Sequence, residues 1–281
     1  MIISENSDYY RMISQNDHGD LAGQFAAHWG NDRFDKLKPY QSMVLAAETH
    51  DNGWWDWDIY PSIDDNGVPI PFTRTPREFR SNFYGKGIDN VIARDAYAGL
   101  IVSMHGVGLG QKRYGTMPSM VERDDPYSQH FIAKREPTHK DMIDKLSSME
   151  QYAALITQER IWHNYLLMQV FDRLSLFFCS NFDITTVAAA GSHTKEGKAY
   201  YGSTIKPTPA SRRGSRIQVE GYQNNFPIID RDFLPKCSPR SFWVRWVYKS
   251  ECHRDNTRYD KIESCESSFG SCRHTQHSRK W

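Results

Sequence analysis

No part of this 281-residue sequence is apolar for long enough to cross a bilayer. The longest apolar runs, such as residues 44–47 and 174–179, are far shorter than a membrane-spanning helix. The first residues, MIISENSDYYRM, also lack the basic start and apolar segment of a secretory signal. We therefore expect a cytoplasmic protein that makes no contact with a membrane.

Cysteine is scarce and unevenly placed. There are five cysteines, and only Cys179 lies in the first 180 residues. An odd number of cysteines without a secretory signal argues against a disulfide framework and favours a reducing compartment.

The G-x-S-x-G motif of serine hydrolases is missing, and the glycine-rich stretch 106–112 fits neither a dinucleotide-binding nor a P-loop pattern.

The overall composition is that of a folded protein. Hydrophobic residues make up 39% of the chain, charged residues 25% and aromatic residues 13%, which excludes a fibrous or wholly disordered chain. The net charge is +1, but residues 1–180 hold 18 Lys or Arg and 24 Asp or Glu, whereas residues 181–281 hold 17 and 10. The acidic balance of the first part makes nucleic acid an unlikely partner for it, because DNA needs a basic surface.

The first part of the chain has the pattern of an all-α fold. Asn16 or Asp17 suits the N-cap of a helix that ends near Gly30, and Pro39 suits the first turn of a helix that ends near His50. Further helices are predicted over residues 88–106 and, as one long helix or two, over 138–180, with core candidates Ile156, Ile161, Leu167, Val170, Leu174 and Phe177. Loops are predicted for residues 54–76, where Pro and an Asn-Gly turn accompany a Trp-rich acidic run, and for residues 107–137.

The character of the sequence changes after residue 182. Residues 183–281 are basic and rich in Ser and Cys, and only residues 241–248 alternate like a strand. We therefore expect a helical metal-binding domain over residues 1–182, followed by an irregular tail that is disordered or not native to it. Two minor hypotheses concern the tail. A zinc site could be formed by Cys265, Cys272, His274 and His277. A surface that stacks on single-stranded nucleic acid could be formed by Trp243, Trp246, Tyr248, Arg240 and Arg245.

Two histidines and two aspartates, placed on three predicted helices, are the candidate ligands of a metal ion. His18 lies on the first helix, His50 and Asp51 close the second, and Asp172 lies in an apolar stretch of the last. Two imidazoles and two carboxylates suit a divalent cation such as Mn, Fe, Co, Ni or Zn, in one or two copies. The simpler alternatives are a capping role for His18, a helix-end role for Asp51 and an ion pair for Asp172, although a buried unpaired Asp is costly.

The spacing of these residues resembles the H…HD…D signature of the HD-domain superfamily of metal-dependent phosphohydrolases. The local sequences resemble the DUF3891 family of uncharacterised, mostly bacterial proteins still more closely over residues 1–180, through QNDHGDLAGQFAAHWG (15–30), VLAAETHDNGWWDWD (44–58) and VFDRLSLFFC (170–179). The HD resemblance implies an HD-like helical bundle in which His18, His50, Asp51 and Asp172 bind metal.

The resemblance implies hydrolysis of a small phosphorylated substrate by water that the metal activates. Asp51 and His105 are the expected catalytic residues, because His105 lies near the end of its helix, where HD enzymes place additional histidines. The alternatives are an HD-type iron oxygenase and a helical scaffold or ligand-binding protein that retains a vestigial metal site. His105 is equally well explained as a structural histidine.

Four residues around the HD pair are candidates for the surroundings of the metal. Trp54 and Trp57 would wall a pocket, and Asp56 would orient water or a histidine N–H group. Glu48 is a weaker candidate for a base, because it points to a different helix face from His50. The competing interpretation is that the Trp-rich run only anchors its loop to the helices.

Overall fold

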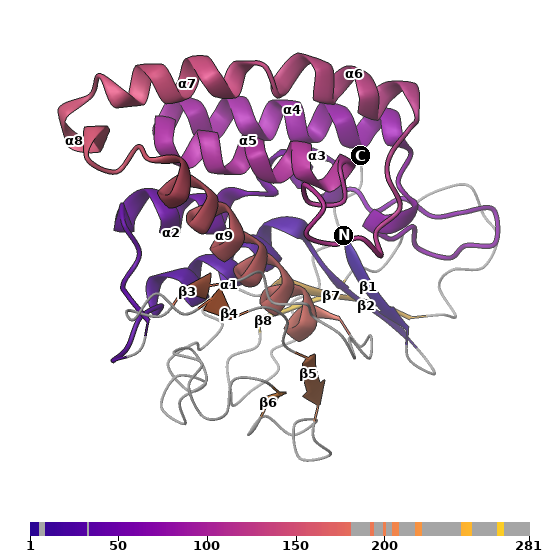
Figure 1. Ribbon diagram of the computed structural model, residues 1–281. Coiled ribbons are helices and arrows are strands. Elements are labelled where there is room, and N and C mark those ends of the chain that lie inside the picture. The colour runs from indigo at the N-terminus through magenta and orange to yellow at the C-terminus, as the bar shows by residue number, and fades with distance from the viewer. Residues whose placement is uncertain are drawn as a thin grey trace.

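The computed structural model describes residues 1–5, 9–32 and 34–180, together with the backbone of six short strands between residues 192 and 266. Helices dominate the described residues, so the predicted helical fold class is confirmed (Figure 1). No helix among them is long and apolar enough to cross a membrane.

The first two helices match the prediction closely. Helix α1 is Gln15–Ala27 and α2 is Tyr40–Thr49. The N-cap of α1 is Ser14 rather than Asn16 or Asp17, because the Ser14 hydroxyl accepts a hydrogen bond from the Asp17 N–H at 3.0 Å. Pro39 immediately precedes α2, as expected.

The Trp-rich run is helical, which corrects the prediction of a continuous loop over residues 54–76. A 3-10 turn, η1 (Asn52–Trp54), leads directly into the short helix α3 (Trp55–Asp58), and a second turn, η2 (Phe72–Arg74), follows the remaining loop. Asp58 holds α3 in place. Its carboxylate accepts from the Gln15 N–H at 2.6 Å and from the Met1 ammonium at 2.7 Å.

Two helices replace the single helix predicted over residues 88–106. Helix α4 is Arg77–Arg94 and α5 is Ala96–Gly110. Asp95 separates them because its backbone is extended and its carboxylate caps α5, accepting from the Ala98 N–H at 2.8 Å. Residues 88–98 contain no glycine or proline. The sequence pattern therefore gave no sign that one helix ends and another begins at Asp95.

The second half of the helical region is also divided more finely than predicted. Helix α6 (Pro126–Arg135) occupies part of the predicted loop, with Asp125 as its N-cap and Pro126 in its first turn. Residues 138–180 form three helices, α7 (Thr138–Ser147), α8 (Glu150–Ala153) and α9 (Gln158–Cys179). The Thr157 hydroxyl caps α9 by accepting from the Arg160 N–H.

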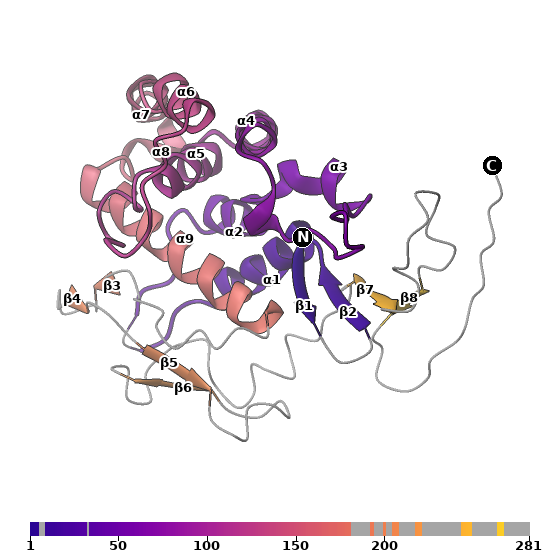
Figure 2. The ribbon, with the colours of Figure 1, turned by 90° about the vertical axis from the view of Figure 1, so that its right-hand side faces the viewer.

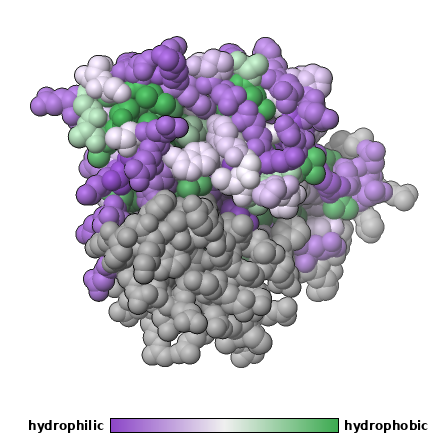
Figure 3. Space-filling model, in the orientation of Figure 1, coloured by the Kyte–Doolittle hydropathy of each residue, from purple (hydrophilic) through white to green (hydrophobic). Residues whose placement is uncertain are grey.

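The helices form stacked layers around one core. Helices α6 and α7 lie outermost over α4 and α5, α1 and α2 lie beneath these, and α9 crosses the stack (Figures 1 and 2). The predicted core positions of α9 are buried at Ile161, Leu167, Val170 and Leu174, and Phe177 and the preceding Ile156 are partly buried against them. The visible face of the helical region is mostly hydrophilic, with small hydrophobic areas between (Figure 3).

A small sheet lies beside the helices. Its strand order is β1 (Ile2–Glu5), β2 (Tyr9–Ile13), β7 (Trp243–Tyr248) and β8 (Glu263–Glu266), all antiparallel. Strand β7 confirms the strand predicted over residues 241–248, whereas the β1–β2 hairpin was not predicted. Two further strand pairs are β3 (Ser192–His193) with β4 (Ala199–Tyr200), and β5 (Thr204–Pro207) with β6 (Ile217–Glu220).

The remaining predictions for the tail fall on residues or side chains outside the described part of the chain. They concern the possible zinc ligands and the aromatic and basic side chains proposed for stacking on nucleic acid.

Candidate metal centre

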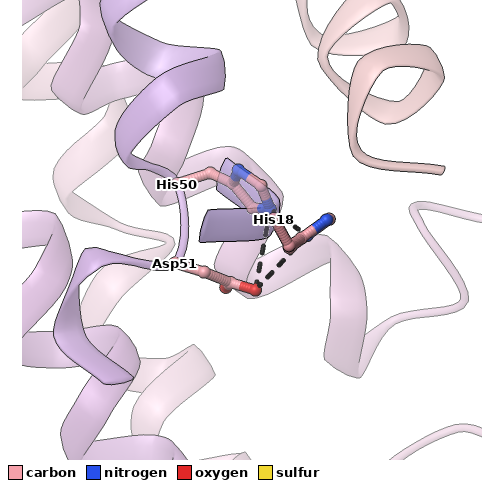
Figure 4. Close-up of side chains that lie close together, drawn as sticks. All are labelled: His18, His50 and Asp51. Carbon is pink, nitrogen blue, oxygen red and sulfur yellow. Dashed lines mark hydrogen bonds and ion pairs between the residues drawn. The ribbon is translucent and has the colours of Figure 1, made fainter. Parts of the chain in front are cut away.

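His18 and His50 point their ring nitrogens at each other from two neighbouring helices (Figure 4). His18 lies in the first turns of α1, and His50 is the residue directly after α2. Their Nε2 atoms are 3.0 Å apart, and the two rings are nearly perpendicular, at 84°. Both side chains are fully buried.

The opposite nitrogen of each ring has a defined partner. His50 Nδ1 lies 2.8 Å from the Ala47 carbonyl oxygen, which can only accept, so this nitrogen carries a proton. His18 Nδ1 lies 2.7 Å from Ser175 Oγ, and that hydroxyl donates to the Asp172 carbonyl oxygen at 2.8 Å. Because the hydroxyl has one proton, it accepts from His18 Nδ1. When both rings are neutral, each has its proton on Nδ1 and a lone pair on Nε2, so the two Nε2 lone pairs face each other.

Two carboxylates stand beside this nitrogen pair. Asp51 Oδ2 lies 3.6 Å from His50 Nε2 and 3.9 Å from His18 Nε2. Asp172 Oδ1, from α9, lies 3.4 Å from His18 Nε2 and 3.6 Å from His50 Nε2. The structure thus brings together all four residues that the sequence nominated, and His18, His50 and Asp51 form a buried group with the spacing of a metal site.

The charges of the centre are strongly coupled. Burial opposes protonation of His50, but the carboxylates of Asp51 and Asp172 outweigh it and raise the pKa of His50 to about 9. Burial raises the pKa of Asp51, while Arg113 and the two histidines overcome the burial of Asp172 and hold its pKa well below the usual range. The geometry therefore favours a positive charge at the two Nε2 atoms, carried by a proton or a cation.

The two oxygens of Asp51 have different surroundings. Oδ2 accepts from the Gln15 side-chain amide at 3.0 Å, whereas Oδ1 is buried with no hydrogen-bond partner. A buried carboxylate oxygen without a donor is costly, so it indicates a group that the protein is built to receive. The sequence reasoning missed Gln15, which carries no motif of its own.

His105 lies directly against this group. Its ring packs edge-on against that of His50, with centroids 5.1 Å apart, and its Nδ1 is 3.3 Å from the Gln169 side-chain amide nitrogen. Because burial holds the pKa of His105 well below its ordinary value, the ring is neutral at pH 7. His105 therefore offers a neutral hydrogen-bonding group next to His50.

Arg113 is the residue that the sequence reasoning missed altogether. It follows α5, and its Nη2 donates to Asp172 Oδ2 at 2.8 Å. Asp172 thus directs one oxygen to the histidine pair and the other to a guanidinium. Nothing in the local sequence QKRYG separates this arginine from an ordinary exposed one, because its role depends on contact with α9.

The four residues predicted to surround the metal differ in burial and contacts. Glu48 and Asp56 are exposed, and Asp56 pairs with Lys86. Trp54 is buried against Phe83, and Trp57 packs on Phe79 and Phe83, as expected of anchoring residues. The histidine Nδ1 atoms are instead hydrogen-bonded to the Ala47 carbonyl oxygen and the Ser175 hydroxyl.

Comparison with protein families gives one match. The model of DUF3891, described as a protein of unknown function, matches residues 1–231. The chain belongs to the DUF3891 family. The match includes all four clustered residues of this DUF3891 protein and extends beyond residue 180, where the resemblance in sequence was expected to end. Comparisons with curated proteins and with solved structures each gave no match.

Proposed function

We propose that this DUF3891 protein binds a divalent metal ion through His18, His50, Asp51 and Asp172 and hydrolyses a small phosphate ester. The observation that carries the proposal is the pair of Nε2 atoms 3.0 Å apart, whose rings both use Nδ1 as a donor. Two lone pairs at this distance repel, so a positive charge is needed at the Nε2 atoms, either a shared proton or a metal ion, and the two carboxylates beside them favour a dication.

The donor set fits a divalent ion. Two nitrogen ligands about 2.1 Å from one ion are separated by about 3 Å when they meet it at a right angle. Carboxylate oxygens of Asp51 and Asp172 lie within 3.9 Å of these nitrogens, and the unpartnered Asp51 Oδ1 adds a further acceptor. Two neutral imidazoles and two carboxylates match the charge of a dication and suit Mn, Fe, Co, Ni or Zn.

Each residue around the ion has a definite task. The bound ion supplies Lewis acidity, which acidifies water and polarises a phosphoryl oxygen. Ser175 and the Ala47 carbonyl hold the two rings with Nε2 facing inward, and Gln15 fixes Asp51 through Oδ2. Asp51 Oδ1 would then be able to accept a proton from the attacking water, and neutral His105 offers a hydrogen bond next to His50.

The reaction class rests on the order of the residues along the chain. His18, His50-Asp51 and Asp172 follow the H…HD…D order of HD-domain phosphohydrolases, and they converge from three helices as such a site requires. The buried position of the group favours a small substrate over a polymer bound across a wide surface.

The first test is metal analysis by mass spectrometry on full-length protein purified without added metal. We expect about one or two equivalents of a divalent transition metal per wild-type chain, and loss of the metal in His50→Ala and Asp51→Ala. His139→Ala is a matched control, since His139 is a partly buried histidine on α7 that hydrogen-bonds to Ser103. The same preparations are assayed with generic phosphomonoesters and phosphodiesters.

The outcomes separate the candidate functions. Metal-dependent turnover that disappears with His50→Ala supports the hydrolase. Iron with a visible or EPR signature and oxygen consumption without ester hydrolysis would replace it with an oxygenase. A wild-type protein that neither contains metal nor takes it up contradicts the metal centre and leaves a helical scaffold.

A further inference from the structure

The guanidinium group of Arg113 has more donors than partners. The side chain is 7% exposed, and Nη2 donates to Asp172 Oδ2 at 2.8 Å. The remaining nitrogens, Nε and Nη1, are buried without a hydrogen-bond partner. A buried, permanently charged group with unused donors indicates a negatively charged ligand, because leaving such donors unpaired is costly.

A second buried donor lies close to Arg113. The hydroxyl of Tyr165, on α9, is buried without a hydrogen-bond partner. It rests on Gly108, where a Cβ atom would be 2.3 Å from the hydroxyl oxygen, and the Gly108 carbonyl accepts from the Arg113 N–H at 2.7 Å. Tyr165 and the backbone of Arg113 thus both contact Gly108, and the charge of Arg113 acts on the Tyr165 hydroxyl. Burial is the larger effect and raises the pKa of Tyr165, which keeps its proton.

The same face of α9 joins this region to the metal centre. Tyr165, Gln169 and Asp172 are spaced by four and three residues, so they share one side of the helix, and all three are buried. Gln169 Oε1 is a further buried polar atom without a partner. The ring of Trp162, 36% exposed, stacks on Tyr165, so one aromatic layer separates the region from the surface.

The backbone fixes Arg113 in an uncommon conformation. Lys112, Arg113 and Tyr114 are consecutive left-handed residues, with φ of 51°, 52° and 53°. Non-glycine residues adopt this conformation at a cost, which is typical of functional segments. The turn is closed by hydrogen bonds from Arg113 N to Gly108 O and from Met117 N to Lys112 O.

The electrostatic surroundings are positive. Burial is the largest cause that lowers the pKa of Arg173 to about 10, and the charge of Arg113 adds to this effect. Burial and the charge of Arg113 also lower the pKa of Arg123. Arg123 and Arg173 therefore both lie within electrostatic reach of Arg113, and Asp172 is the carboxylate that Arg113 contacts. With a dication at the histidines, this side of the centre would carry excess positive charge.

We propose that Arg113 and Tyr165 bind the phosphoryl group of the substrate next to the metal centre. The assignment rests on the proposed function for the nature of the substrate. A phosphoryl group has three terminal oxygens and carries one or two negative charges, so it accepts from Nε, Nη1 and the Tyr165 hydroxyl and offsets the positive charge. Asp172 then links the two halves of the site, with one oxygen toward the metal ligands and one toward Arg113.

The test measures binding of inorganic phosphate to the full-length protein by isothermal titration calorimetry, with acetate as a comparison anion. Titrations are made after chelation and after loading with Mn²⁺. Arg113→Lys keeps a positive charge for Asp172 but lacks the planar fork, and we expect it to weaken phosphate binding by about 10- to 100-fold. Tyr165→Phe removes only the hydroxyl, with an expected loss of about 2- to 10-fold.

Arg135→Lys is the matched control, because Arg135, at the end of α6, is a largely buried arginine paired with Asp89 on α4. Its affinity for phosphate should equal that of the wild type. If Arg113→Lys does not fold, as judged by circular dichroism, Tyr165→Phe decides the question.

Each result bears on one proposal at a time. Phosphate binding that depends on Arg113 and Tyr165 supports the anion site, even if the wild-type protein neither contains nor takes up metal and the hydrolase proposal fails. Phosphate affinity unchanged in both variants, or no phosphate binding by the wild type, overturns the anion site while the metal content still stands. Acetate binding as tight as phosphate binding overturns the assignment to a phosphoryl group.

Discussion

Hydrogen bonds at Nδ1 decide which nitrogen each histidine offers to a ligand. Ser175 performs this task for His18 because its hydroxyl is committed as a donor to the Asp172 carbonyl and can only accept from the ring. The same hydroxyl thereby ties α9 to α1 at the centre. A small polar residue with no chemistry of its own thus sets the orientation of a proposed metal ligand.

Ser175→Ala should weaken metal binding without changing any ligand. Removal of the hydroxyl frees the His18 ring to rotate or to change tautomer, and such losses typically reduce metal affinity by about 10- to 100-fold. The measurement is the dissociation constant for Mn²⁺ or Zn²⁺ by competition with a chelating dye. Ser103→Ala is the control, since Ser103 is also a buried helical serine, 2.9 Å from His139 Nε2. Equal affinities for Ser175→Ala and the wild type would contradict the orienting role.

At this scale the sequence predicts the ligands but not their partners. His18, His50, Asp51 and Asp172 stand at a recognisable spacing along the chain, and the structure brings them together. Ser175, Gln15 and Arg113 act through contacts between α9, α1 and the turn after α5, which are distant in sequence. A serine, a glutamine and an arginine are common on any helical protein, so nothing local distinguishes these three.

At the scale of elements, close packing of α1 on α2 brings the two histidines together. Gly19 and Gly23 face Glu48 across this contact, where a Cβ atom would lie 2.6 Å from the Glu48 carbonyl oxygen and 2.7 Å from its Cβ. Neither position has room for a side chain, so the helices approach more closely than larger residues would allow. The separation of His18 and His50 follows from this approach.

Gly23→Ala should therefore destabilise the protein despite the better helix propensity of alanine. Overpacking of this kind costs about 1–3 kcal/mol in the free energy of unfolding. Gly85→Ala on α4 is the matched control, because its nearest neighbour would be Arg135 Nη2 at 3.6 Å, an ordinary contact. It should stabilise by up to about 1 kcal/mol. Urea unfolding measures both, and equal effects of the two substitutions would show that the α1–α2 contact is not tight.

The contact of α7 with α5 should make stability sensitive to acid. Burial lowers the pKa of His139, 2.9 Å from Ser103 Oγ, from 6.5 to about 4. Between these values the unfolded chain binds more protons than the folded one, so this contribution to stability is lost as the pH falls from about 6.5 to about 4. Between pH 7 and pH 5 the loss is about 2 kcal/mol.

His139→Gln should remove this loss, and urea unfolding at pH 7 and pH 5 measures it. The wild type should lose about 2 kcal/mol more than the variant over that interval. The exposed His130 on α6 provides the control, since His130→Gln should retain the wild-type dependence. A His139→Gln variant with the same loss as the wild type would contradict the assignment.

The helix boundaries show what local patterns miss. Pro39 marked the start of α2, whereas Asp95, Asp125 and Thr157 each cap a helix that the periodicity alone merged or overlooked. Such residues are common in loops and within helices as well as at caps. Their backbone conformation, set by packing of the flanking helices, decides between these roles.

At the scale of the whole molecule, the sheet joins the beginning of the chain to its last third. Strand β2 pairs with β1 on one side and with β7 on the other, with Tyr9 opposite Tyr248 and Ile13 opposite Val244. The helices of the metal centre lie within residues 15–179, so none of its four residues comes from the sheet. Stability and metal binding should therefore respond differently to loss of β7 and β8.

A chain that ends at Ser180 should keep its helical circular dichroism and its metal content but unfold at a lower temperature. It loses the five residue pairs between β2 and β7 and leaves β2 as an open edge. For a domain of this size, each kcal/mol lost lowers the melting temperature by about 2–4 °C. A chain that ends at residue 231, where the family match ends, loses the same two strands and keeps β3 to β6. If pairing with β7 is the main contribution of the last third to stability, the two shortened chains should have the same melting temperature, lower than that of the full chain. Loss of metal from the chain ending at Ser180 alone would instead show that residues 181–231 complete the centre.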